Sequence, residues 1–350
     1  MSKSVYIGTT AAAIKGTLLG RSAVEKLAES TTLEELVNRL KGTPYSGVLS
    51  SVPKPYEARR LELSFRERLA DAHYLLMSQS KEYGLISLYY MKQMAWDLKS
   101  VLKSKAMGKD GESMEYLTMH AEELVGRRDL IVRVIAARDL TEASSLLSGT
   151  EFGEDVQMAV AAFGAKGEIH IFDLYVDHSI MSKIAAAYFT NAKLYSSPRA
   201  VDVAGVGEMV ALDVNAYNIL SVLRAKLWRL PEEEVRGLVV PPRRNPALVD
   251  VRALIEAESV SEATKLLEGT LPWSPRTRPS DEDTIDSVED FFIAKSIQVA
   301  KRAFVWQGLS IASALAVTKL LEFEVRNLAA IAIGIEARMD TKAVLSKLVF

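Results

Sequence analysis

The amino-acid sequence predicts an all-α protein built from three similar helical domains. Three observations lead to this prediction. A short capped helix occurs three times, a longer helical block follows it each time, and the two-residue alternation typical of strands is not sustained. With 350 residues, the chain is long enough to form a large core or two to three smaller ones.

The first repeated motif is a short helix with a recognisable beginning. Its copies start at Thr32, Asp139 and Ser259, at offsets of 107 and 120 residues. The side-chain oxygen of each starting residue is suited to accept a hydrogen bond from a free backbone N–H group of the first turn. A glutamate stands three residues later in every copy and is expected to complete a capping box: Glu35, Glu142 and Glu262.

Each copy ends in the dipeptide Gly-Thr, and an aromatic residue follows shortly afterwards. Glycine tolerates the left-handed backbone that often ends a helix. We therefore expect left-handed C-caps at Gly42, Gly149 and Gly269. One capping box is a weak signal, but three copies with the same length and the same ending indicate a triplicated unit.

A longer helical block recurs in the later part of each unit. Residues 218–240 match residues 327–349 at an offset of 109, and residues 97–105 match residues 218–226 at an offset of 121. Each block is expected to form a long helix, a cap residue and a short terminal helix.

Helical patterns also occupy the segments between the motifs, at residues 57–82, 173–189 and 288–304. The apolar run 130–134 is ambiguous by itself. Its counterpart 249–254 lies among helix formers, so both are expected to be helical.

The repeats divide the chain into three expected domains, residues 1–119, 120–241 and 242–350. The turn-rich segments 107–111 and 239–242 lie close to the two boundaries. Units of about 110 residues exceed ordinary solenoid repeats, and three of them suggest a pseudo-threefold arrangement. Residues 274–286, rich in proline and acidic side chains, are expected to form an exposed loop in the third unit.

The composition excludes several classes of function. A formal net charge of −2 gives no bulk attraction to nucleic acid. The absence of cysteine excludes disulfides, thiolate catalysis and metal sites with cysteine ligands. The longest apolar stretches, 309–317 and 328–335, are far shorter than the roughly 20 residues of a membrane-spanning helix, and no signal peptide is apparent. A soluble, cytoplasmic chain is expected, which could still bind a membrane protein.

No phosphate-binding loop is predicted. Such a loop needs the order Gly-x-x-x-x-Gly-Lys-Ser/Thr, whose backbone N–H groups surround the phosphates. In residues 8–17 the lysine precedes the second glycine, and residues 164–167 lack the hydroxyl residue. A Gly-x-Ser-x-Gly nucleophile elbow is missing as well.

The sharpest candidate for a metal site is the group His170, Asp173, Asp177 and His178. On a helix the first three share a face, and imidazole with carboxylates binds divalent ions. The other two units contain no equivalent group, so a solvated polar face is the favoured interpretation.

A second polar group, Glu322, Glu324, Arg326 and Asn327, interrupts an apolar helix near the C-terminus. A catalytic carboxylate pair is one interpretation, but no nucleophile or metal partner accompanies it. We expect a polar seam between helices, with Glu322 and Arg326 paired one turn apart.

Two aromatic pairs, Tyr89-Tyr90 and Phe291-Phe292, are expected in the core and at its boundary. They do not alternate with basic residues, as a surface that stacks on nucleic-acid bases would. No catalytic, cofactor-binding or metal-binding residue is therefore assigned.

Residues 319–328, together with Ile331, Gly334 and the helix expected at 340–349, resemble a known C-terminal signature. It belongs to the C subunit of the archaeal A-type and related V-type ATP synthases, whose eukaryotic counterpart is called the d subunit. Residues 36–49 are similar to that family's motif Leu-x-x-Thr-x-Tyr-x-x-Leu. Residues 9–15 and 176–180 depart from the family pattern, which indicates a divergent member.

The resemblance implies a funnel of three helical domains, bound as a peripheral protein to the cytoplasmic face of the cell membrane. A protein of this kind is part of the central stalk, or rotor, and links the shaft subunits to the proteolipid ring during ATP synthesis driven by protons or sodium ions. It has no catalytic activity, no cofactor, no direct small-molecule substrate and no nucleic-acid partner.

Two alternatives remain open at this point. One is a helical scaffold or adaptor of another multi-subunit assembly, which shares the fold but has other partners. The other is a metal-dependent enzyme that uses His170 and Asp173.

Overall fold

The computed structural model describes residues 3–79, 84–109, 117–190, 200–241, 249–273, 280–306 and 308–350. Every regular element in these ranges is an α-helix, so the predicted all-α class is confirmed. Six helices are long: α5 (Ala58–Gln79), α6 (Gly84–Ala106), α11 (Ile171–Thr190), α12 (Ala200–Leu227), α16 (Asp281–Trp306) and α17 (Ile311–Glu336).

Shorter helices connect and cover the long ones. They are α1 (Lys3–Gly16), α2 (Arg21–Ala28), α3 (Leu33–Leu40), α4 (Ser46–Leu49), α7 (His120–Leu124), α8 (Arg128–Ala136), α9 (Leu140–Leu147), α10 (Gly153–Lys166), α13 (Glu232–Leu238), α14 (Val251–Glu256), α15 (Val260–Glu268) and α18 (Thr341–Ser346). The ambiguous runs 130–134 and 249–254 fall mostly in α8 and α14, so their helical assignment is confirmed.

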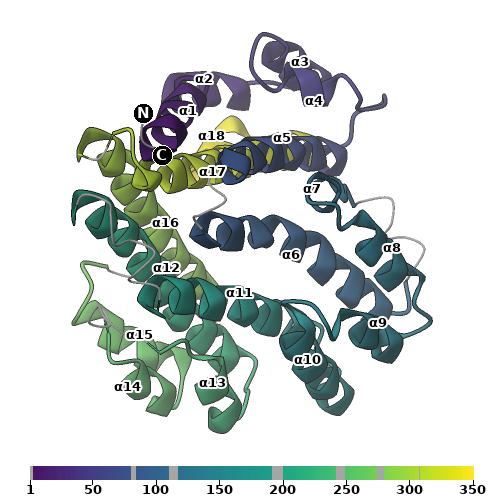
Figure 1. The fold of residues 1–350 in the computed structure, drawn as a ribbon, viewed down its shortest axis with the longest axis vertical. Helices are drawn as coiled ribbons and strands as arrows, with labels where there is room; N and C mark the ends of the chain where they lie inside the picture. The colour runs from purple at the N-terminus through teal and green to yellow at the C-terminus, as the bar shows by residue number, and fades with distance from the viewer. Residues whose placement is uncertain are drawn as a thin grey trace.

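The six long helices contact one another in a closed circuit (Figure 1). Helix α5 packs on α6, α6 on α11, α11 on α12, α12 on α16, α16 on α17, and α17 returns to α5. Three of these contacts join helices that are distant in the sequence: α6 with α11, α12 with α16, and α17 with α5. The circuit encloses a common space between the helices.

Two main hydrophobic cores support this arrangement. The larger one extends across α6, α11, α12, α16 and the first turns of α17. The second joins the two ends of the chain, because Val24 and Leu36 from the N-terminal helices pack with Leu321 and Val344 from α17 and α18. Helices α2 and α18 from the two ends of the chain accordingly lie against each other (Figure 1).

The three predicted N-caps are confirmed. The side chains of Thr32, Asp139 and Ser259 accept hydrogen bonds from the backbone N–H groups three residues later, at 3.1, 2.8 and 3.1 Å. The glutamate that donates each N–H group reaches back one residue farther than a standard capping box predicts. Its carboxylate accepts from the N–H of the residue before the cap, at 2.9, 2.8 and 2.6 Å in the three copies.

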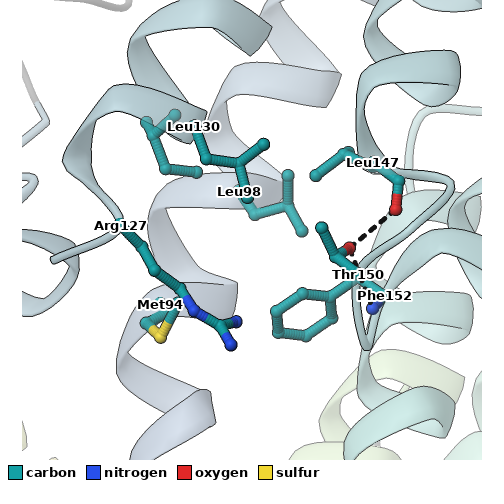
Figure 2. Close-up of a pocket in the computed structure, with 8 residues that line it drawn as sticks. Met94, Leu98, Arg127, Leu130, Leu147, Thr150 and Phe152 are labelled. Atoms are coloured by element: carbon teal, nitrogen blue, oxygen red, sulfur yellow. Dashed lines mark hydrogen bonds between the residues drawn. The ribbon is translucent and has the colours of Figure 1, made fainter. Parts of the chain in front are cut away.

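The predicted left-handed C-caps at Gly42, Gly149 and Gly269 are wrong. None of these glycines has a positive φ, because the chain continues in a right-handed turn after each short helix. The following threonine ends the helix, since its hydroxyl donates to a leucine carbonyl of the last turn. Figure 2 shows the middle copy, where the Thr150 hydroxyl donates to the Leu147 carbonyl and Phe152 lies beside Leu98.

Left-handed residues instead end three of the long helices, α6, α12 and α17. Gly108, Arg229 and Arg338 have φ values of 66°, 55° and 54°. They stand at matching positions of the repeated block, at the offsets of 121 and 109 found in the sequence. In each case the next N–H group donates to the carbonyl five residues earlier, at 3.0, 2.9 and 2.9 Å, which satisfies a free carbonyl of the last turn.

The loop expected at 274–286 is shorter than predicted at its C-terminal side, and residues 274–279 lie outside the described residues. Helix α16 already starts at Asp281, because Ser280 and Asp283 exchange side-chain to backbone hydrogen bonds at 3.1 and 3.2 Å. The acidic residues that suggested a loop stabilise the first turn of the helix through its dipole.

Among the described residues, one segment is long and apolar enough to cross a membrane, Gly205–Leu227 of α12. Its apolar window is 72% buried within the fold. Packing against α11 and α16 accounts for the apolar character of this helix.

Candidate functional site: the six-helix cavity

A cavity of about 940 Å³ lies in the space that the six long helices enclose, and we call it the six-helix cavity. Its lining comes from all six of these helices and contains both apolar and charged side chains. A second pocket, lined by residues of α3 and the end of α17, has a volume of about 350 Å³.

Residues at matching positions of the repeated block line this cavity. Lys92, Asp213 and Glu322 form one such set, separated by the offsets 121 and 109. Two further sets line it in the same register: Trp96, Tyr217 and Arg326, and then Lys99, Leu220 and Ala329. The three copies of the long helix therefore present the same face to the cavity but fill it with different side chains.

A charged cluster is formed by Asp213 and its neighbours. The Lys319 ammonium contacts both carboxylate oxygens of Asp213 at 2.6 Å, and the Tyr89 hydroxyl donates to the same carboxylate. Burial raises the pKa of Asp213, but the positive charges of Lys319 and Lys92 outweigh it, so the pKa lies below its usual value. Asp213 is therefore ionised at neutral pH.

Lys92 completes this cluster from α6. Burial lowers the pKa of Lys92, but the carboxylates of Glu322, Asp213 and Asp177 outweigh burial and raise the pKa above its usual value. The cluster thus joins α6, α12 and α17 through charges at matching positions.

Ion pairs also connect the cavity wall between helices that are distant in sequence. Lys99 contacts Asp177 at 2.8 Å and Lys103 contacts Asp173 at 2.5 Å, which joins α6 to α11. Glu289 of α16 accepts from Arg224 of α12 at 2.6 Å and from Arg326 of α17 at 3.2 Å.

The α5–α6 part of the wall is held by an aromatic contact. The guanidinium groups of Arg66 and Arg59 lie 4.3 and 5.2 Å from the ring centre of Trp96. Arg66 is fixed in turn by Glu62 at 2.8 Å. A cation stacked on an indole contributes about 0.5–1 kcal/mol at such partly exposed sites.

The four residues of the candidate metal group do not converge. Asp173 and Asp177 pair with the lysines of α6, as described above, and His170 stacks on Trp228 with 3.7 Å between ring centres. His178 bonds Asp155 through Nδ1 at 2.9 Å and Ser182 through Nε2 at 3.0 Å. Within the part of the chain that the structure describes, no group of three or more metal-binding side chains comes together.

The polar group near the C-terminus forms the expected seam between helices. Glu324 accepts from the Tyr45 hydroxyl at 2.7 Å and from the backbone N–H of Leu19. Arg326 contacts Glu289 and Asp290 on α16, so the predicted pairing with Glu322 is not among the described ion pairs. Glu322 faces the charged cluster.

The remaining candidates from the sequence lie in helices and in or beside the hydrophobic core. Residues 8–16 belong to helix α1 and residues 164–166 to the last turn of α10, so neither segment forms a loop around a phosphate. Tyr89, Tyr90 and Phe292 are buried and Phe291 is half-buried, as expected for core and boundary aromatics.

Sequence reasoning missed the residues that make the charged cluster. The signal was present, since Asp213 stands in the middle of a long apolar stretch and the repeat offsets align it with Lys92 and Glu322. Lys319 gave no such signal, because the matching positions carry Tyr89 and Val210. The pairing of Lys319 with Asp213 depends on the packing of α12 on α17, which the sequence spacing does not specify.

Comparison with known proteins identifies similar chains. A family model described as ATP synthase (C/AC39) subunit matches residues 8–346. The chain is 24% identical over 333 residues to a Thermococcus kodakarensis protein, covering 93% of this chain and 84% of the relative. It is 25% identical over 336 residues to a Pyrococcus horikoshii protein, with the same coverage of both chains. A Desulfurococcus protein is 24% identical over 338 residues, with 95% and 86% covered. All three relatives are named as the C subunit of an A-type ATP synthase.

Proposed function

Because the chain belongs to the ATP synthase (C/AC39) subunit family, we propose that it is the central-stalk subunit that connects the rotating shaft to the proteolipid ring. Family membership makes it a subunit of a rotary ATP synthase. The six-helix cavity is the observation that supports the finer role. A cylinder as wide as an α-helix, about 10 Å, with a volume of 940 Å³ is roughly 12 Å deep. The cavity thus has room for about two turns of a helix from the shaft.

A connector must transmit torque, which requires that the helices around the six-helix cavity form a rigid wall. The ion pairs from Lys99 to Asp177 and from Arg224 to Glu289 join helices across the wall of the cavity. The buried Asp213–Lys319 pair adds a contact between α12 and α17. These contacts support a stiff socket, since each one ties together helices that are far apart in the sequence.

The socket is built from three helical domains in a pseudo-threefold, funnel-like arrangement, with sequence boundaries at 1–119, 120–241 and 242–350. Three features support this part of the proposal. The capped short helices recur with the same hydrogen bonds, matching positions line the cavity, and the long helices contact one another in a closed circuit.

The protein acts without catalysis of its own, at the cytoplasmic face of the membrane, as a peripheral protein. Its partners are the central shaft subunits and the proteolipid ring, and the complex uses a proton or sodium gradient to make ATP. The charged side chains of the cavity support a structural role, because most of them are engaged in ion pairs with each other.

A pair of matched variants tests the socket. Ile333 is 50% exposed and lines the cavity, whereas Val132 is 43% exposed on α8 and is not part of the lining. Introducing a charge at Ile333 (Ile333→Glu) places an unpaired carboxylate against the inserted shaft, which costs binding several kcal/mol. Val132→Glu is the control, since it adds the same charge to a similarly exposed site.

Binding is measured by titrating each variant with the isolated shaft subunits. We expect Ile333→Glu to weaken binding at least tenfold and Val132→Glu to leave it unchanged, with equal thermal stability in both. Equal binding by the two variants would exclude the cavity as the shaft socket. Isolation of the native chain in an assembly without ATP synthase subunits would instead favour a scaffold of another complex.

A further inference from the structure

In the repeated block, a side chain of the long helix binds the backbone of a residue 22 positions later, and we call this contact the clamp. The chemistry of the clamp differs in its first copy. In the second copy, Asn218 donates to the Val240 carbonyl at 2.8 Å and accepts from the Val240 N–H at 2.9 Å. In the third copy, Asn327 makes the same two bonds to Val349, at 2.7 and 2.9 Å. Both partners stand 22 residues after the asparagine.

The first copy has aspartate at the matching position. Asp97 accepts from the N–H of Met119, again 22 residues later, at 2.9 Å. A carboxylate has no proton to donate, so an ionised Asp97 makes only half of the clamp. The Met119 carbonyl accepts from Glu123 in helix α7 instead.

A second carboxyl group is buried beside Asp97. Glu122 of α7 is fully buried and Asp97 is 2% exposed, and the two carboxyl groups are near enough to shift each other's pKa. Oδ1 of Asp97 and both carboxyl oxygens of Glu122 are buried and have no hydrogen-bond partner among the described residues. Two carboxylates cannot hydrogen-bond to each other unless one of them carries a proton.

The charged surroundings do not neutralise this pair. Arg66 of α5 is a nearby cation that favours the ionised form of Asp97, but it also pairs with Glu62. Arg127 and Arg128 at the start of α8 pair with Glu151 and Glu123. Further titratable groups close to this region are Glu67, Asp71 and Tyr74 from α5, Tyr90 from α6 and His120 from α7.

We propose that Asp97 and Glu122 hold one proton between them, and that its loss releases residues 117–124 from α6. With the proton present, a carboxyl–carboxylate hydrogen bond joins α7 to α6 and replaces the missing half of the amide clamp. Without the proton, two buried negative charges face each other and push α7 away. The segment is already strained, because Met119 adopts a left-handed backbone with φ of 48°.

We call the proton-bridged contact between Asp97 and Glu122 the latch. The pH range in which the latch holds follows from the direction of the pKa shifts of the two groups. Burial raises the pKa of Asp97 to about 6 and, with the charge of Asp97, raises the pKa of Glu122 to about 8. The folded values lie above the unfolded ones, so the stabilisation by the latch is fully present below about pH 4 and is lost as the pH rises through about 8, where the last proton leaves the pair. The asparagine clamps at Asn218 and Asn327 contain no titratable group and remain closed throughout.

Amide hydrogen exchange of the full chain tests the proposal with internal references. The reporter is the N–H of Met119, and the references are the N–H groups of Val240 and Val349 in the two amide clamps. After correction for intrinsic exchange, we expect the protection of Met119 to fall at least about tenfold relative to the references between pH 6 and pH 9. Equal pH dependence of the three amides would overturn the proposal.

Two variants and one control separate the latch from other effects. Asp97→Asn restores an amide clamp and Glu122→Gln removes the second charge, so each is expected to abolish the extra pH dependence of Met119. Asp71→Asn removes a carboxylate that also contacts α7, through His120 at 2.7 Å, but is half exposed, and it should leave that dependence in place. Persistence of the dependence in Glu122→Gln contradicts the shared proton even if Asp97→Asn fails to fold.

A direct titration provides the final check. In protein labelled with ¹³C at the glutamate carboxyl carbons, the resonance missing from Glu122→Gln is assigned to Glu122. We expect it to titrate above pH 6.5, whereas a midpoint near 4.5 would show that the pair carries no shared proton.

Discussion

Asn327 fixes Val349 through both ends of its side-chain amide, because Nδ2 donates to the Val349 carbonyl and Oδ1 accepts from the Val349 N–H. The asparagine is buried on α17, and Val349 is the next-to-last residue of the chain. The pair therefore attaches the C-terminal end to the helix that also lines the cavity.

Replacing the donor of this clamp is expected to loosen the C-terminal end. Asn327→Asp keeps the size of the side chain but sets a carboxylate oxygen against the Val349 carbonyl, which costs about 1–3 kcal/mol. Thermal unfolding followed by circular dichroism measures the loss. Asn38→Asp, the same change on an exposed face of α3, should shift the midpoint little; equal shifts would contradict the importance of the clamp.

The left-handed arginine after α17 provides a stabilising substitution. A side chain at φ of 54° crowds its own backbone, so Arg338→Gly should increase the free energy of unfolding by about 1 kcal/mol. Arg133→Gly, in the last turn of α8, should lower it by up to about 1 kcal/mol because glycine weakens a regular helix. Chemical denaturation of both variants checks the opposite signs.

The buried Asp213–Lys319 pair and the exposed Glu34–Lys54 pair have nearly equal separations, 2.6 and 2.5 Å, but differ in burial. Lys319→Met should destabilise the protein by about 3 kcal/mol, because it leaves Asp213 with one fewer positive neighbour in a buried site. Lys54→Met should leave the stability almost unchanged, because water and salt screen the exposed pair.

A double-mutant cycle completes this comparison. Asp213→Asn combined with Lys319→Met should cost less than the sum of the two single changes, since neither partner is then left unpaired. Simple additivity would mean that the two groups do not act as a pair.

His73 is expected to account for part of the decrease in folding stability at acidic pH. Burial lowers the pKa of His73 to about 4, and its Nε2 lies 3.1 Å from the Ile86 carbonyl. The unfolded chain has a histidine pKa of about 6.5, so between pH 6.5 and pH 4 the unfolded state binds the proton and stability falls, by at most about 1.4 kcal/mol per pH unit.

A side chain at position 73 that does not titrate removes the dependence of the free energy of unfolding on pH in this range. His73→Gln should flatten the stability profile between pH 4 and 6.5, measured as the unfolding midpoint in urea at each pH. His120→Gln, at a partly exposed histidine, should retain the slope. A slope that is unchanged in His73→Gln would assign it to other groups.

The periodicity of the sequence was sufficient for the helical class and for the N-caps, because these depend on local hydrogen bonds that Thr32, Asp139 and Ser259 make within four residues. The C-caps were mispredicted since two mechanisms compete after a Gly-Thr ending. The threonine hydroxyl can satisfy the last carbonyl without a left-handed residue, as it does at Thr150.

The cavity depends on contacts that sequence spacing does not specify. The repeat offsets placed Lys92, Asp213 and Glu322 at matching positions, but they did not indicate that the three helices face one space. Similarly, Arg326 pairs with α16 and not along its own helix, because the helix packing brings Glu289 within 3.2 Å.

The core shared by the two chain ends has a consequence for biosynthesis. Leu321 and Val344, the packing partners of Val24 and Leu36, are synthesised about 300 residues later. At about 5–20 residues per second, the N-terminal helices wait roughly 15–60 seconds for the helix that covers them. A chain that stops before α17 leaves this apolar surface exposed to solvent, which makes it a substrate for chaperones.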